Sequence, residues 1–129
     1  MSAPQSKLLS TLGLCARARG LVTGTPMVCD AMRAGATKGK QTVLAVLVAS
    51  DASANTKEKL TSKCTYYGVP LYCPDITVAD MGRAVGKSGL VAAVGITHEG
   101  LWRALSEHLS ATASSDKGRH IIFLRTSSD

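Results

Sequence analysis

Two continuous runs of apolar residues stand out in a chain whose hydrophobic positions otherwise recur mostly at helical spacing. Their sequences are VLAVLVA at residues 43–49 and LVAAVGI at residues 90–96. Runs of this length, bounded by polar residues, are typical of strands that are covered on both faces. A shorter apolar segment over residues 69–73 follows Gly68 and predicts another strand.

The N-terminal part of the chain predicts two helices. Apolar residues recur at helical spacing from Ser6, which we expect to cap the first helix, to Gly20, which we expect to end it. The second helix starts with Thr25 as its N-cap and Pro26 at its first position, and we expect it to end at Gly35.

Further helices alternate with the strands. Residues 53–67 carry an apolar stripe, residues 77–86 open with a sequence that resembles a capping box, and we expect Thr97 to cap the last helix. Strands that alternate with helices of about ten or more residues indicate a three-layer α/β/α sandwich. We interpret residues 1–110 as one domain and residues 111–129 as a polar linker and C-terminal extension to which the sequence assigns no role.

The charge of the chain favours a polyanionic partner. Fifteen Lys and Arg residues against nine Asp and Glu give a formal net charge of +6, and the sequence pI is about 9.4. Most of the excess lies within residues 1–40, where six basic residues accompany Asp30 as the one acidic residue. This asymmetry suggests a nucleic acid, although a solvated basic face without a ligand would have the same composition.

The chain lacks a convincing catalytic or metal-binding motif. Cys15, Cys29, Cys64 and Cys73 have neither CxxC spacing nor histidines at zinc-finger intervals, so we interpret them as buried or idle thiols. Residues 82–88, GRAVGKS, resemble a phosphate-binding loop, but three residues instead of four separate the two glycines, and the segment follows a helix rather than a strand. We therefore expect a protein that is not an enzyme and needs no cofactor or metal.

The sequence also carries an expectation about location. It shows no secretory signal, and no apolar run approaches the roughly 18 residues that a membrane span needs. Cysteines without disulfide spacing fit a reducing compartment. We expect a cytoplasmic protein without a membrane partner.

The start of the second predicted helix is the most informative place for binding. Gly24 precedes it, so backbone N–H groups and the positive end of the helix dipole would face a ligand at residues 25–27. Arg17 and Arg19 are close in sequence. The segment is either a seat for phosphate or an ordinary capped helix start, and local sequence leaves both open.

Five blocks of the sequence, in this order, resemble the kink-turn-binding ribosomal protein family, the large-subunit seven-Ae and thirty-e group, and are closest to its small bacterial ribosomal-protein-like members. The resemblance as a whole covers about residues 6–109. The blocks are LGLCARARGLVTG (residues 12–24), ASDASANT (49–56), KC with YGVP (63–64 and 67–70), MGRAVGK (81–87) and VGIT (94–97).

The resemblance implies an α/β/α sandwich, with a central four-stranded mixed sheet, that binds RNA without catalysing a reaction. In that family the start of the second helix enters the major groove of a sharply bent RNA and reads sheared G·A pairs, while the loop before the last core strand covers an extruded base. Carried over by position, and with the two neighbouring arginines, the expected RNA-binding residues are Arg17, Arg19, Gly24, Thr25, Pro26, Met27, Asp30, Ser50, Asp51, Lys87, Ser88 and Gly89.

The partner expected first is therefore structured RNA, either ribosomal RNA or a kink-turn element, with the ribosome or another protein as a further partner. Many members of the family carry Asn or another polar residue at the position of Pro26. They carry Glu or Gln at the position of Met27 and Lys at the position of Asp30. Pro26, Met27 and Asp30 favour an alternative, a protein-interaction module that keeps the fold but has lost specific RNA recognition. Its partner would contact the Met27 surface or the apolar residues 121–124.

Overall fold

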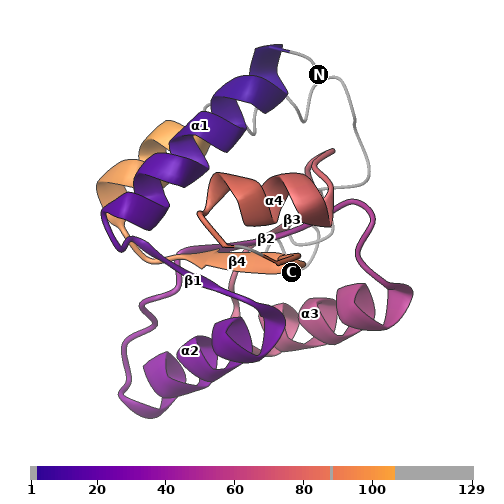
Figure 1. Cartoon of the computed structure of the whole chain (residues 1–129). Coiled ribbons are helices and arrows are strands. Elements are labelled where there is room, and N and C mark those ends of the chain that lie inside the picture. The colour runs from indigo at the N-terminus through magenta and orange to yellow at the C-terminus, as the bar shows by residue number, and fades with distance from the viewer. Residues whose placement is uncertain (1–2, 88, 107–129) are drawn as a thin grey trace.

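A mixed four-stranded sheet separates two layers of helices in the computed structural model (Figure 1). The structure describes residues 3–87 and 89–106, so the predicted extension at 111–129 and the apolar residues 121–124 lie outside it. The strand order is β1-β4-β2-β3. Strand β4 is antiparallel to both of its neighbours, and β2 is parallel to β3. The strands are β1 (Leu21–Thr23), β2 (Ala45–Val48), β3 (Leu71–Tyr72) and β4 (Ala93–Ile96).

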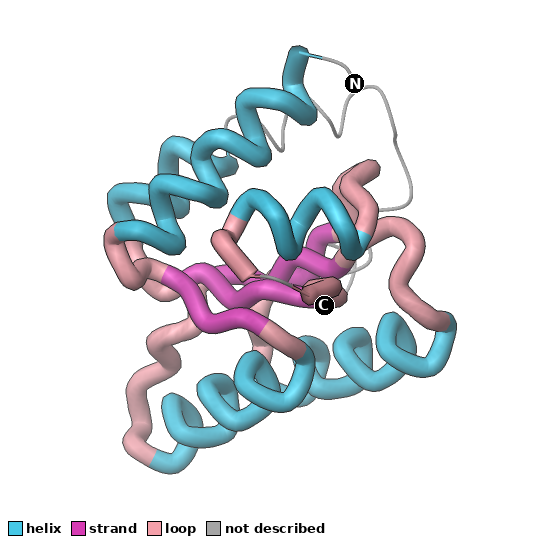
Figure 2. The backbone as a smooth tube through the Cα atoms, viewed as in Figure 1, coloured by secondary structure: helices cyan, strands magenta, loops and turns pink. Residues whose placement is uncertain are grey.

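Helices cover both faces of the sheet (Figure 2). Helices α1 and α4 pack together on one face, and α2 and α3 pack together on the other. A further helical segment covers residues 99–106. This arrangement confirms the predicted three-layer sandwich with a mixed sheet of four strands. The helices are α1 (Ala3–Arg17), α2 (Thr25–Thr37), α3 (Ala54–Tyr67) and α4 (Val78–Ala84).

The core forms where the two apolar runs meet. Every residue of β2 and β4 is buried, and Leu12, Met32, Leu60 and Met81 close over them from the helices with no exposed surface. The prediction that each run contains a strand covered on two faces is therefore confirmed, although both strands are shorter than the runs. The pattern did not predict β1, because its three half-buried residues are too few to show a period.

Two predicted boundaries of α2 are wrong. Gly24, not Thr25, is the N-cap, and Thr25 is already helical. At the other end, the helix passes Gly35 and continues to Thr37. Gly35 is buried there because Gln41 packs directly against it and donates a side-chain hydrogen bond to the Met32 carbonyl at 2.9 Å. The glycine thus makes room for a neighbour and does not end the helix.

Two other predicted caps are also wrong. Helix α1 begins at Ala3, so Ser6 lies inside it. At the last helical segment His98, not Thr97, takes the capping position, because its Nδ1 accepts a hydrogen bond from the backbone N–H of Leu101 at 3.1 Å. The cap predicted for α4 is correct, because Thr77 accepts from the Asp80 N–H. Helix α3 begins one residue after its predicted start, and Ser53 is its N-cap and accepts from the Thr56 N–H.

Candidate nucleic-acid interface

The start of α2 is attached to the sheet through backbone atoms. The N–H of Gly24 donates to the carbonyl of Ala93, the first residue of β4, at 2.8 Å. Gly24 has φ 92° and ψ 140°, a conformation that residues with a Cβ rarely adopt, and a Cβ built on it would meet no atom within 4 Å. The helix start is therefore held in place while a ligand can approach its backbone closely.

The side chains of this helix start are open to solvent. Pro26 and Met27 are exposed, Met27 by 56%, and Thr25 is half-buried. No side chain forms a capping hydrogen bond at Gly24. The first N–H groups of α2 can therefore donate to an anion, aided by the helix dipole.

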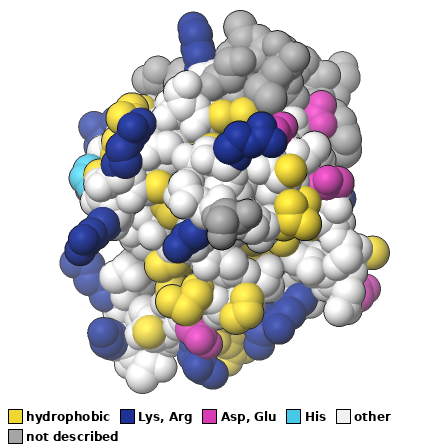
Figure 3. All heavy atoms as spheres, in the orientation of Figure 1, with side chains coloured by type: hydrophobic (Ala, Val, Ile, Leu, Met, Phe, Trp, Pro, Cys, Tyr) yellow, Lys and Arg dark blue, Asp and Glu magenta, His cyan; other side chains and the backbone are white. Residues whose placement is uncertain are grey.

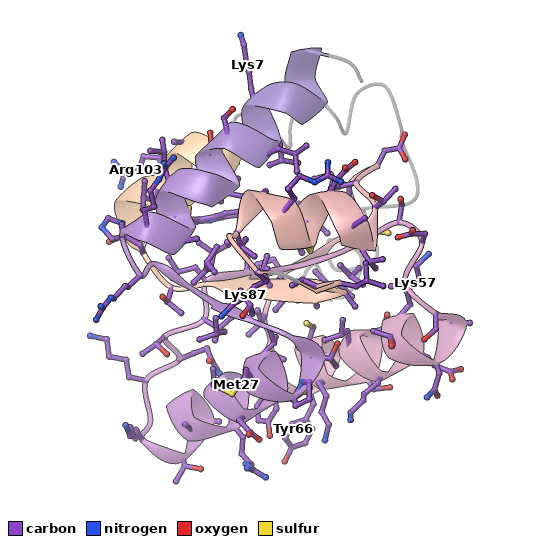
Figure 4. The ribbon with its side chains drawn as sticks, in the orientation of Figure 1. Lys7, Met27, Lys57, Tyr66, Lys87 and Arg103 are labelled. Carbon is purple, nitrogen blue, oxygen red and sulfur yellow. The ribbon has the colours of Figure 1, made fainter. Side chains whose placement is uncertain are left out.

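The loop that connects α4 to β4, residues 86–91, lies next to this helix start. Lys87 is exposed, and its backbone N–H donates to the Gly82 carbonyl at 2.9 Å. Leu90 is 73% exposed. Figure 4 shows Lys87 and Met27 on the same face of the molecule, one on each side of the sheet edge. Ser88, also predicted as a site residue, lies outside the described residues.

Ser50 and Asp51 take part mainly in contacts within the protein. Ser50 donates to the Ile76 carbonyl from its N–H at 2.8 Å and from its Oγ at 3.2 Å. The Asp51 carboxylate accepts from the Val78 N–H, the first of α4, at 2.8 Å. Both residues thereby position α4 and, through it, the 86–91 loop.

The two arginines at the end of α1 are exposed but differ in surroundings. Arg17 lines a groove between α1 and α4 together with Gly86, so its cation lies close to the start of the 86–91 loop. Arg19 has φ 58°, which is the left-handed region that costs a residue with a Cβ energy. It reaches this conformation because Gly20 must donate back to the Cys15 carbonyl, at 2.7 Å, where the chain turns from α1 into β1.

Asp30 is paired with a cation from its own helix. Its Oδ1 lies 3.0 Å from the guanidinium of Arg33, and both side chains are more than 60% exposed. The repulsion that Asp30 would exert on a phosphate is therefore reduced by its neighbour. The i,i+3 spacing of these residues could have revealed the pair from sequence.

The charges on this side of the molecule are distributed unevenly. In Figure 3 hydrophobic side chains gather in the middle of the face that carries Lys87 and Met27, and Lys and Arg side chains surround them on several sides. Asp and Glu side chains appear mainly toward the right of this view. An apolar centre with a cationic surround suits a ligand that combines flat bases with phosphates.

Residues 6–106 match the family model described as ribosomal protein L7Ae/L30e/S12e/Gadd45. The chain belongs to this family. The RNA-binding protein YlxQ of Bacillus subtilis (strain 168) is 40% identical to it over 89 residues, which are 69% of this chain and 81% of that protein. The RNA-binding protein YlxQ of Enterococcus faecium is 32% identical over 83 residues, 64% of this chain and 74% of that protein.

Solved structures share the fold of this L7Ae-family chain. A protein with unknown function from Bacillus halodurans C aligns with a TM-score of 0.69 at 36% identity, over 81% of this chain and 97% of that chain. The Giardia lamblia 15.5kD RNA binding protein aligns with a TM-score of 0.69 over 88% of this chain and 91% of that chain. Its identity is 19%, so this likeness concerns the fold alone.

The cysteines of this L7Ae-family protein are mostly buried. Cys15, Cys64 and Cys73 lie in the core, and Cys29 is half-buried. Burial, with the neighbouring Cys29 thiol as a smaller cause, raises the pKa of Cys64 to about 12. Within residues 3–87 and 89–106, no group of three or more His, Cys, Asp or Glu side chains could hold a metal ion, and no helix is long and apolar enough to span a membrane.

Leu90 and Arg83 were not predicted from the sequence as residues of the surface around Lys87. Leu90 was assigned to a buried strand, but its side chain is exposed because β4 begins only at Ala93. Arg83 was noticed only as part of the false phosphate-binding loop, yet it is exposed on α4 next to the groove that holds Arg17. A count of charges on the outward face of the predicted helix at 77–86 could have identified Arg83.

Proposed function

We propose that this protein is a non-catalytic, cytoplasmic RNA-binding protein whose ligand is a sharply bent structured RNA, either a kink-turn or a comparable element of ribosomal RNA. The observation that carries the proposal is the backbone hydrogen bond from Gly24 to Ala93, which holds the exposed start of α2 beside the 86–91 loop. Membership of the L7Ae family and the similarity to two proteins named as RNA-binding support it.

The helix start is suited to crowded phosphates. A bent RNA brings phosphates close together, and cationic side chains with helix-terminal N–H groups lower the cost of that crowding. Gly24 leaves open space for the RNA backbone, Thr25 presents a hydroxyl beside it, and Arg17, Arg19 and Lys87 add positive charge. These contacts orient the RNA and carry no base sequence information.

The apolar centre of the surface is suited to an unpaired base. RNA-binding proteins recognise bases mainly where loops or bulges expose them, and apolar side chains pack against base faces. Met27 and Leu90 are exposed, and Leu90 belongs to the same loop as Lys87. In this proposal Gly89 allows the base to approach the loop backbone, and Ser88 donates to the base or its phosphate.

The same residues restrict what the protein reads. Pro26 has no N–H, Met27 offers only a weak acceptor, and Asp30 is paired with Arg33. One good base-edge contact is worth about 1 to 3 kcal/mol of discrimination. We therefore expect the protein to recognise the shape and charge of the RNA. Its affinity should depend less on the G·A pairs than it would if side chains at these positions formed hydrogen bonds with base edges.

A titration with three RNAs tests the proposal. They are a kink-turn RNA, the same RNA with its G·A pairs replaced, and a plain duplex of equal length, each measured across a salt series. We expect the kink-turn to bind most tightly and all three affinities to fall as salt rises. Equal affinity for all three RNAs would overturn the bent-RNA ligand, and no binding at low salt would overturn RNA binding altogether.

A protein-interaction module is the second candidate. The exposed side chains of Met27 and Leu90, 56% and 73% accessible, favour it, because large apolar side chains near one another often mark protein contacts. The two candidates differ in the effect of Lys87→Ala. RNA binding predicts a loss of affinity that shrinks at high salt, whereas an apolar protein contact predicts little dependence on this cation.

A further inference from the structure

Three shallow hollows adjoin one another around Arg83 on the outer side of α4. One lies between α1 and α4, has a volume of about 390 Å³ and is lined by Arg17 and Arg83. Another, of about 360 Å³, lies beside the 86–91 loop and is lined by Arg83 and Lys87. The third, of about 270 Å³, extends toward the first half of α1. Arg83 lines all three, and we call the surface that these neighbouring hollows form the α1–α4 surface.

Two parts of the chain that are distant in sequence supply the cations of this surface. Arg17 comes from the end of α1, Arg83 from α4, and Lys87 from the loop after α4. Asp80 is the one acidic residue among the lining residues of the three hollows. Its carboxylate lies 3.5 Å from the Arg83 guanidinium, which is long for a strong hydrogen bond and leaves the Arg83 side chain 74% exposed.

The floor of the α1–α4 surface is made of small residues, and its walls are packed closely. A Cβ on Gly13 of α1 would lie 3.1 Å from the Ala84 carbonyl of α4. A Cβ on Gly82 of α4 would overlap with the backbone carbonyl oxygen of Gly89 in the loop. Because the backbones are in contact, the segments that carry the three cations are fixed relative to one another. The small lining residues are Gly13, Ala16, Ala79, Ala84, Gly86 and Gly89.

We propose that the α1–α4 surface binds the sugar-phosphate backbone of one RNA stem that flanks the bend, with Arg83 as its central contact. This inference rests on the proposed function and extends it, because it adds a second binding region that reads neither the bend nor any base. Guanidinium groups match phosphate oxygens with paired donors, and a shallow floor admits a backbone but offers no pocket for a base. The stem would run from Lys87 across Arg83 toward α1.

The test combines a protein variant with RNA length. Arg83→Ala is titrated against a bent RNA with two full stems and against versions in which each stem in turn is shortened to a few base pairs. With full stems we expect the affinity to fall by about 5- to 20-fold and the salt slope to decrease by about one. With the relevant stem shortened, Arg83→Ala and the unmodified protein should bind equally.

Three further variants separate this contact from general electrostatics. Lys59→Ala removes the same charge from exposed α3, on the opposite face of the sheet, and should leave the affinity nearly unchanged. Asp80→Asn removes the acidic neighbour of Arg83 and should tighten binding severalfold. An Arg83→Lys variant should recover part of the loss. Denaturant unfolding of each variant establishes that it is folded.

The outcomes distinguish this inference from the proposed function. If the unmodified protein binds the bent RNA but Arg83→Ala binds equally, the α1–α4 surface is not a binding region and the proposed function stands. A loss that remains the same whichever stem is shortened, or an equal loss for Lys59→Ala, also overturns the inference. If the unmodified protein binds no RNA, both are overturned.

Discussion

Gly82 in α4 lies against the backbone carbonyl of Gly89 so closely that a methyl group at position 82 would overlap with it. Two backbone segments are in direct contact there, and the contact supports the loop that carries Lys87. A flexible side chain could move aside for an added methyl group, but a backbone carbonyl moves only with its whole loop. Glycine at 82 therefore determines where the 86–91 loop lies.

Gly82→Ala should destabilise the fold and displace the loop. Overpacking of this kind costs about 1 to 3 kcal/mol, so the urea midpoint should fall accordingly. Gly89→Ala is the matched control, because a Cβ on Gly89 meets nothing within 4 Å, and its midpoint should stay close to that of the unmodified protein. Equal midpoints for the two variants would contradict the contact.

Arg19→Gly should raise stability and lower RNA affinity together. The left-handed conformation of Arg19, with φ 58°, costs about 1 to 2 kcal/mol, which glycine avoids at an entropic cost of about 0.5 to 1 kcal/mol. We expect a net gain of about 0.5 to 1 kcal/mol in the free energy of unfolding. Arg19→Ala removes the same charge but keeps the strain, so it should lose RNA affinity without gaining stability.

His98→Ala should weaken the last helical segment. The His98 Nδ1 accepts from the Leu101 N–H, and loss of a capping acceptor costs about 1 kcal/mol. His98→Asn should recover most of this loss because its side-chain oxygen can cap the helix. Thr97→Ala should change the unfolding free energy by less than about 0.5 kcal/mol. A larger effect for Thr97→Ala than for His98→Ala would restore Thr97 as the cap.

Cys64 should make the protein less stable at alkaline pH. Its pKa rises from 9.0 to about 12 in the fold because burial disfavours the thiolate. Between these values the folded chain holds a proton that the unfolded chain has lost, so stability is lost as pH rises through this window. At pH 10 the loss from this thiol is about 1.4 kcal/mol.

The measurement for Cys64 is a comparison of pH dependence between two proteins. Cys64→Ala changes the packing, and hence the free energy of unfolding, by the same amount at every pH. Between pH 7 and pH 10 it also removes the part of the stability loss that comes from ionisation of this thiol. We expect the variant to lose about 1.4 kcal/mol less than the unmodified protein over this interval. Parallel losses would show that the Cys64 thiolate is not disfavoured by the fold.

Hydrophobic pattern alone identified the central elements. Residues 45–48 and 93–96 are buried strands, as their apolar runs predicted, because a segment covered on both faces has no polar position to interrupt it. Thr77 was recognised as a cap since the bond it accepts comes from an N–H group three residues away. Both signals are local and can be read without knowing the fold.

Predictions failed where a distant segment decided the outcome. Gly35 looks like a helix end, yet Gln41 packs on it inside a longer helix. Thr97 looks like a cap, but its N–H donates to the Gly20 carbonyl and His98 takes the capping role. The role of Ser50 and Asp51 in RNA binding stays a prediction, but the hydrogen bonds of their polar groups to Ile76 and Val78, more than 20 residues away, could not be foreseen from local sequence.

The sequence by itself determined the layers of the sandwich, the basic excess and the glycine before α2, since each of these depends on the kind of residue at successive positions. The tertiary structure decided which residues lie together on the surface that we propose binds RNA. The Gly24 to Ala93 bond joins the start of α2 to β4, and backbone contacts at Gly13 and Gly82 place the end of α1, with Arg17, beside α4 and the loop that carries Lys87. Local spacing cannot encode this arrangement, because it arises only when helices from separate parts of the chain pack on one sheet.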